Sequence, residues 1–206
     1  MMSPLATASV SLYQVPLRCE AVPGMGCGVV AKPILAILAR EPAVAEAWLN
    51  RNGTIVAIRW RERSASKVPG ERIRSILAEQ GLAARELAGA ARKSTLRDFA
   101  SGADWYRGDA VDRLSDEEAA IIAARLVHRV TAKVPLSDDK IETLLKAFGE
   151  VCRHQLINRP VTSASLRRQR IANEIMKAGR KHLDGAVLKA LEEAVALGHQ
   201  PTTGEK

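Results

Sequence analysis

The chain has 206 residues, of which 47% are hydrophobic and 3% aromatic, and its 31 Lys or Arg outnumber 23 Asp or Glu to give a formal net charge of +8. This length and composition predict one ordinary domain or two small ones, with cores built mostly from aliphatic side chains. No apolar run is long enough to span a membrane, so we expect no membrane insertion.

Cysteine usage indicates the compartment. The chain has three cysteines, an odd number that does not suggest a secreted disulfide framework. Residues 1–11 contain neither a basic region nor the long apolar run of a signal peptide. We therefore expect reduced thiols in a cytoplasmic protein.

The first predicted strand, within residues 12–22, leads into a turn that holds three glycines in five residues, 24–28. A short helix should follow, and Pro33 suits its first position because proline lacks an amide N–H. Two β-rich runs, 44–49 and 54–60, flank Asn50-Arg51-Asn52-Gly53, which is a strong hairpin signal.

A second amphipathic helix is predicted over residues 70–80, with Gly81 as its stop, and a strand over 82–87. The resulting order is β-α-β-β-α-β. The fold class predicted for residues 11–90 is therefore α+β, with the ferredoxin-like arrangement of one antiparallel sheet and two helices on one face.

This stretch resembles the heavy-metal-associated domain of copper chaperones and metal-transporting ATPases. That family carries Gly-Met-x-Cys-x-x-Cys after its first strand, and residues 24–30 here read Gly-Met-Gly-Cys-Gly-Val-Val. Residues 42–50 and 53–56 also look like the family's helix end and hairpin. The resemblance covers about the first 90 residues, and Val30 stands where the second cysteine would be.

The resemblance implies that Cys27 binds Cu(I) or another soft metal ion. Such an ion needs a second sulfur, and Cys19, eight residues earlier, or a second subunit in a homodimer could supply it. Met25 is a further candidate ligand, although the matching methionine of this fold usually points into the core. Two other readings stay open, a Cys27 that simply packs in a glycine turn and a weak phosphate site at the helix N-terminus.

Residues 91–111 are predicted to be a linker that docks through its aromatic side chains Phe99, Trp105 and Tyr106. The remainder has helical periodicity and predicts an all-α helical bundle domain over residues 112–197, followed by a polar tail, 198–206. Expected helix N-caps are Ser115, Ser137 and either Thr162 or Ser163.

Two basic clusters carry the excess positive charge, and they are solvated faces or contacts for an acidic partner such as nucleic acid. The first comprises Arg59, Arg61, Arg63, Lys67, Arg72 and Arg74, and the second comprises Arg159, Arg167, Arg168, Arg170, Lys177, Arg180 and Lys181.

No catalytic constellation is recognisable, because His128, His182 and His199 are isolated from suitable partners and the acidic residues 116–118 are explained by a helix start. The sequence thus predicts a non-enzymatic metal-handling or metal-sensing accessory protein with Cys27, Cys19 and Met25 at its site. The alternative is a metal-free ferredoxin-like binding module whose helical domain holds a protein or nucleic-acid partner.

Overall fold

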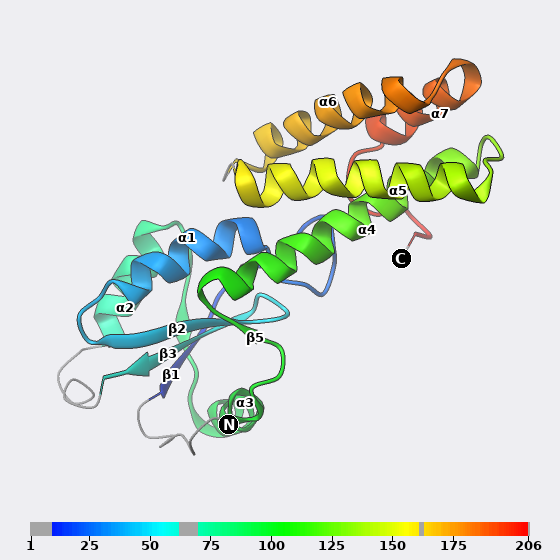
Figure 1. Cartoon of the computed structure of the whole chain (residues 1–206). Helices are drawn as coiled ribbons and strands as arrows, with labels where there is room; N and C mark the ends of the chain where they lie inside the picture. Colours follow the sequence, from blue (N-terminus) through cyan, green and yellow to red (C-terminus); the bar gives the residue numbers. More distant parts are fainter. Residues whose placement is uncertain (1–9, 62–69, 161–162, 206) are drawn as a thin grey trace. The chain divides into compact units, whose positions relative to one another are not determined.

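The computed structural model of the chain describes residues 10–61, 70–160 and 163–205 (Figure 1). Within these residues, seven α-helices and five antiparallel strands form a mixed α/β structure. The chain divides into two compact units. The sheet unit comprises Met1–Cys19 and Gly24–Val111, and the helical unit comprises Glu20–Pro23 and Asp112–Lys206.

The sheet has the order β4-β1-β3-β2-β5, and every neighbouring pair is antiparallel. Its strands are β1 (Val10–Gln14), β2 (Val44–Asn50), β3 (Ile55–Trp60), β4 (Arg85–Glu86) and β5 (Trp105–Tyr106). In this register Ala57 of β3 lies between Leu12 of β1 and Trp48 of β2.

Helices cover both faces of this sheet (Figure 1). They are α1 (Gly28–Ala39), α2 (Gly70–Glu79) and α3 (Gly89–Ser101), and a short 3-10 turn, Gly108–Val111, closes the unit. The amphipathic helix α2 ends where predicted, and Gly81, two residues after its end, takes a left-handed φ of 75°.

Helix α1 starts earlier than the sequence predicted. Pro33 lies inside the helix and not at its first position, since Cys27 is the N-cap. The extra turn is stabilised by packing, because Gly28, Val29 and Ala31 are buried. This burial outweighs the intrahelical hydrogen bond that proline cannot donate.

The stretch 91–111, expected to be a linker, instead contributes α3 and strand β5 to the sheet unit. Phe99 packs edge-on against Trp105 and Trp48, with ring centroids 4.9 and 5.8 Å away. These rings join Val10 and Leu12 in a core on one face of the sheet. The aromatic side chains are therefore internal anchors of the sheet unit.

The helical unit is built from α4 (Asp112–Thr131), α5 (Asp138–Arg153), α6 (Ala164–His182) and α7 (Gly185–Ala196), with a π-helical turn, His154–Asn158, after α5. Each helix packs on the next, and α7 also packs on α4. Among the described residues, no helix combines the length and apolar character needed to cross a membrane.

The predicted caps differ in outcome. Ser163 is the N-cap of α6 and accepts a hydrogen bond from the Leu166 amide, whereas Thr162 lies outside the described residues. Ser137 occupies the N-cap position of α5, but its side chain makes no capping hydrogen bond. Ser115 is not a cap, because α4 already begins at Asp112 and Ser115 is buried inside it.

Candidate metal centre

Residues 17–27 form a short β-hairpin, called the thiol hairpin below. Arg18 and Gly26 form an antiparallel bridge between its two arms. The Cys19 amide donates to the Met25 carbonyl at 2.7 Å, and the Cys27 amide donates to the Leu17 carbonyl at 2.8 Å. These bonds fix the register, so Cys19 lies opposite Met25.

This register places the three predicted metal ligands on one face of the thiol hairpin. Alternate residues of an antiparallel pair point to opposite faces, so Arg18 and Gly26 share one face while Cys19, Met25 and Cys27 share the other. Cys19 and Cys27 are diagonal neighbours, a relation that typically separates residues by about 7–8 Å. The hairpin thus brings two cysteines that are eight residues apart in the sequence to diagonal positions on one face.

All three sulfur-bearing side chains are buried. Cys19 and Cys27 are each 5% exposed, and Met25 is 1% exposed. Cys152, the remaining cysteine, is buried in the helical unit, and all three cysteines are thiols. Burial and the nearby Glu118 carboxylate raise the pKa of the Cys152 thiol to about 12, so this residue is an unreactive internal reference.

Two glycines allow the β2–β3 turn to support the thiol hairpin. The Gly26 amide donates to the Arg51 carbonyl at 2.7 Å, and the Leu17 amide donates to the Gly53 carbonyl at 2.9 Å. A Cβ atom on Gly26 would lie 2.9 Å from the Gly53 Cα, closer than packing permits. The turn glycine Gly26 therefore serves close backbone approach, and its amide is already used within the fold.

The end of the thiol hairpin is also the start of α1. Cys27 has extended backbone angles, and its carbonyl accepts the first helical hydrogen bond, from the Ala31 amide at 2.9 Å. The N-terminus of a helix favours negative charge. Cys27 therefore lies at the N-terminal end of α1, with its side chain buried.

The donor set of the hairpin fits a soft ion. Within the residues that the structure describes, no group of three or more His, Cys, Asp or Glu side chains could hold a metal. The hairpin offers two thiols and one thioether, which are ligands typical of Cu(I) and unsuited to Mg²⁺ or Ca²⁺. Val30, at the position of the missing second cysteine, lies within α1.

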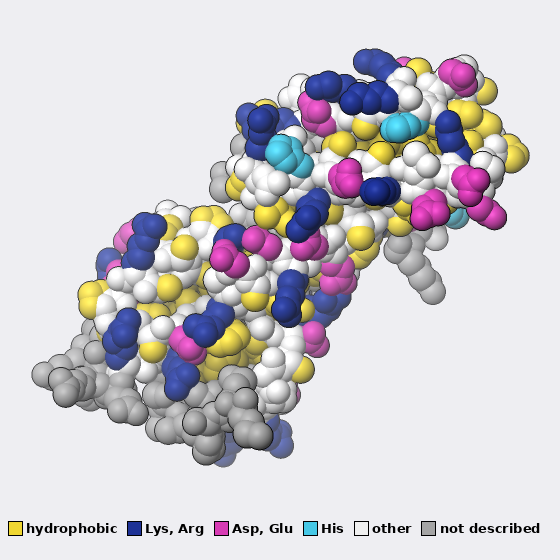
Figure 2. Space-filling model, viewed as in Figure 1, with side chains coloured by type: hydrophobic (Ala, Val, Ile, Leu, Met, Phe, Trp, Pro, Cys, Tyr) yellow, Lys and Arg dark blue, Asp and Glu magenta, His cyan; other side chains and the backbone are white. Residues whose placement is uncertain are grey.

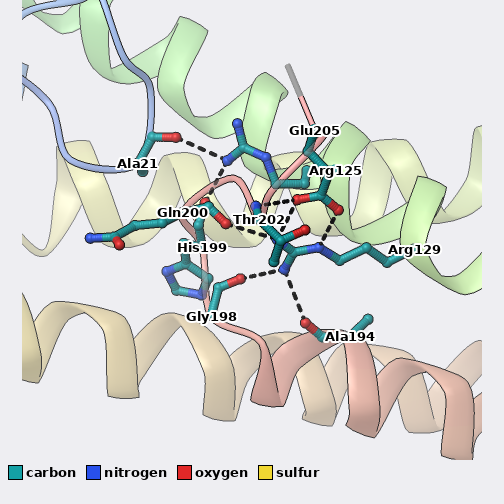
Figure 3. A network of polar contacts seen from close by, with 9 residues as sticks. All are labelled: Ala21, Arg125, Arg129, Ala194, Gly198, His199, Gln200, Thr202 and Glu205. Carbon is teal, nitrogen blue, oxygen red and sulfur yellow. Dashed lines mark hydrogen bonds and ion pairs between the residues drawn. The ribbon is translucent and has the colours of Figure 1, made fainter.

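The helical unit contains a buried polar centre that the sequence reading missed, called the arginine core below (Figure 3). It comprises Arg125, Arg129, His199 and Glu205. The Arg129 guanidinium donates to both Glu205 carboxylate oxygens at 2.8 and 2.7 Å and to the Gln200 carbonyl at 2.8 Å. It also donates to the carbonyls of Ala194 and Gly198, at the C-terminal end of α7.

Arg125 lies one turn before Arg129 on α4, and the side chains of both arginines are buried. The only hint in the sequence is that two arginines four residues apart share a helix face with the buried apolar residues Ile122 and Leu126. Their acceptors, backbone carbonyls and the Glu205 carboxylate, are more than 60 residues away in the sequence, and no local pattern encodes them.

Burial and the positive charge of nearby arginines hold His199 neutral. Burial, together with repulsion from Arg168, Arg129, Arg125 and Arg167, lowers the pKa of the His199 imidazole to about 4. Glu205, in contrast to His199, is held in its charged form. Hydrogen bonding from Arg129 lowers the pKa of the Glu205 carboxyl to about 2 and keeps it ionised.

The two basic clusters differ in the structure. In the first, Arg59, Arg72 and Arg74 pair with Glu46, Glu41 and Glu86, while Arg63 and Lys67 lie outside the described residues. In the second, α6 carries six Lys or Arg against one acid, Glu174. Figure 2 shows dark blue side chains gathered where Figure 1 draws α6.

Comparisons of this chain with protein-family models, with curated proteins and with solved structures found no match.

Proposed function

We propose that this protein is a non-enzymatic metal-handling or metal-sensing accessory protein that binds one soft ion, Cu(I) first among them, at the thiol hairpin. The observation that carries the proposal is the register Arg18–Gly26, which sets Cys19, Met25 and Cys27 on one face. Cys19 takes the role of the second thiolate ligand, and Met25 contributes a thioether. Thiols kept reduced for this purpose fit a cytoplasmic protein.

The architecture supports this interpretation. The order β4-β1-β3-β2, with α1 and α2 between the strands in sequence, is what a ferredoxin-like sheet requires, and β5 extends it. We interpret α4–α7 as a helical bundle, since each helix packs on the next and the last on the first.

Burial of the site affects both the affinity for a soft ion and the rate of its uptake. Thiolates in a dry environment bind a soft cation strongly, because neither water nor competing charge weakens the interaction. An ion reaches them only when the hairpin opens, so uptake should be slower than at an exposed loop.

Metal titration of anaerobically purified protein tests the proposal. Wild type should take up one equivalent of Cu(I) or Hg(II), and Cys27→Ser and Cys19→Ser should each lose it. Cys152→Ser is the matched control and should bind as wild type does. Uptake that is unchanged in both hairpin variants would refute the proposal.

The same titration tests a homodimer. If Cys27→Ser abolishes uptake, Cys19→Ser retains it and two chains share one ion, then the second sulfur comes from a second subunit. Size-exclusion chromatography with and without the ion distinguishes this arrangement from a monomeric site.

The alternative function, a metal-free binding module that holds nucleic acid, is favoured by the charge of α6. Arg170, Arg180 and Lys181 are exposed, and no ion pair joins them to an acid among the described residues. Phosphates would be their natural partners, with a salt slope of roughly −0.9 per contact on duplex DNA. A triple Gln variant at these positions should lose binding, and Arg59→Gln, which removes a paired arginine, should not.

No retention of wild type on duplex DNA at low salt would exclude this alternative and leave a protein partner to be considered.

A further inference from the structure

The tip of the thiol hairpin, Glu20–Pro23, belongs to the helical unit, although the residues on both sides of it belong to the sheet unit. The chain passes from Cys19 directly into this tip and leaves it at Gly24, the residue before Met25. Whatever holds the tip therefore limits how far the two arms that carry the sulfur atoms can separate.

Arg125 holds the tip to the C-terminal tail. Its Nη1 atom donates to the Ala21 carbonyl at 2.9 Å and also to the His199 carbonyl, and both bonds are buried (Figure 3). Ala21 and Val22 are 8% and 9% exposed. A planar guanidinium can serve two carbonyls at once, which the single ammonium of lysine does less well.

A second set of contacts supports this arrangement. The Glu20 carboxylate accepts from Arg168 at 2.9 Å and from the Gln200 side chain at 3.4 Å. Gln200 and His199 in turn belong to the tail that Arg129 and Glu205 fasten to α4. Tail and tip are thus fixed by one continuous network.

We propose that Arg125 is a positioning residue for the thiol hairpin, and that the C-terminal tail, through Arg125, controls access of a soft ion to Cys19 and Cys27. With the network intact the tip is held and both thiols stay buried. Release of the tail frees the tip, and the arms open more often. This inference rests on the proposed metal-binding function of the hairpin.

Thiol reactivity of the full-length protein without metal tests the positioning role. Wild type and Arg125→Met are treated with iodoacetamide under native conditions, and labelling of each cysteine is followed by mass spectrometry. We expect Cys19 and Cys27 to react roughly tenfold faster in the variant, the effect of losing one charge-assisted hydrogen bond from the closed state. Cys152 should stay slow.

The matched control is Arg153→Met, which removes an exposed arginine paired with Asp116 in the same unit. It should leave all three rates unchanged. Unchanged rates at Cys19 and Cys27 in Arg125→Met, or an equal rise at all three cysteines, would overturn the proposal, because the first shows no positioning and the second only general loosening.

A second variant, truncated after Gly198, covers the case in which Arg125→Met does not fold. It lacks His199, Gln200 and Glu205 but keeps Arg125 and Ala21, and the rate at Cys152 reports any general loosening caused by the loss of Glu205. The same selective acceleration of Cys19 and Cys27 is expected, and its absence refutes control by the tail. Since no metal is present, selective acceleration together with failed Cu(I) uptake would contradict the metal function and not the positioning role.

Discussion

The thiol hairpin and the arginine core both tie distant parts of the chain together, but they do so with opposite chemistry. In the hairpin, backbone amides and carbonyls make the bonds, and glycines let the chains approach. In the arginine core, two buried guanidinium groups bind carbonyls and a carboxylate. The backbone hydrogen bonds of the hairpin need only small side chains beside them. The buried guanidinium groups of the arginine core are stable only when every acceptor is in place.

Arg129→Met should produce the largest effect, because it removes the group that joins Glu205 and three carbonyls. We expect a loss of about 3–5 kcal/mol in the free energy of unfolding, the usual result of breaking a buried ionic group. Urea denaturation measures it. Arg153→Met, at an exposed ion pair, should cost less than about 1 kcal/mol, and equal losses in both variants would contradict the assigned difference between buried and exposed pairs.

Gly53→Ala tests the backbone side of the comparison. Gly53 has a φ of 66°, and a Cβ there would lie 2.5 Å from the Gly26 Cα. Strain and the clash together should cost about 2–4 kcal/mol, measured by thermal or urea unfolding. Gly81→Ala is the control, since its φ is 75° but no atom lies within 4 Å of the added Cβ. Its free energy of unfolding should therefore fall less, because only backbone strain and no clash is introduced.

The arginine core should weaken in acid, unlike the hairpin. The pKa of His199 is about 4 in the folded protein against an ordinary 6.5. As pH falls below 6.5 the unfolded chain binds a proton that the folded protein still excludes, so stability is lost between about pH 6.5 and 4, by up to about 3 kcal/mol. Unfolding measured across this range should show the loss in wild type, and His199→Gln should show much less.

A further acid step is expected from Glu205. Its pKa is lowered to about 2 in the folded protein, so the stability it contributes is present above its ordinary pKa and is lost as the pH falls toward about 2. Glu205→Gln should remove this lower step and leave the step from His199. Identical acid profiles for wild type and both variants would contradict the assignment of these groups.

Gly149→Ala should have the smallest effect and the opposite sign. Gly149 lies inside α5, and no atom lies within 4 Å of an added Cβ. Replacing glycine by alanine in a helix interior stabilises by about 0.5–1 kcal/mol. A thermal melt should show a slightly raised midpoint, and a lowered one would indicate crowding that the structure does not contain.

Local patterns in the sequence predicted much of the sheet unit. The runs 44–49 and 54–60 and the turn at Asn50–Gly53 appear as β2, β3 and their connection, because alternation and turn chemistry act within a few residues. The apolar stripes of the second half likewise appear as α4–α7. The candidate ligands Cys19, Met25 and Cys27 could be named from their soft side chains, but not their mutual placement.

Tertiary structure decided what depends on long-range contacts. The early start of α1 and the folding of residues 91–111 onto the sheet follow from burial of side chains against partners distant in sequence. The register of Arg18 with Gly26 depends on the Gly53 turn, and Arg125 and Arg129 find their acceptors only once the tail has returned to α4. A residue's own neighbours in the sequence set its propensity, but the carbonyl or ring that it meets is set by the folded chain.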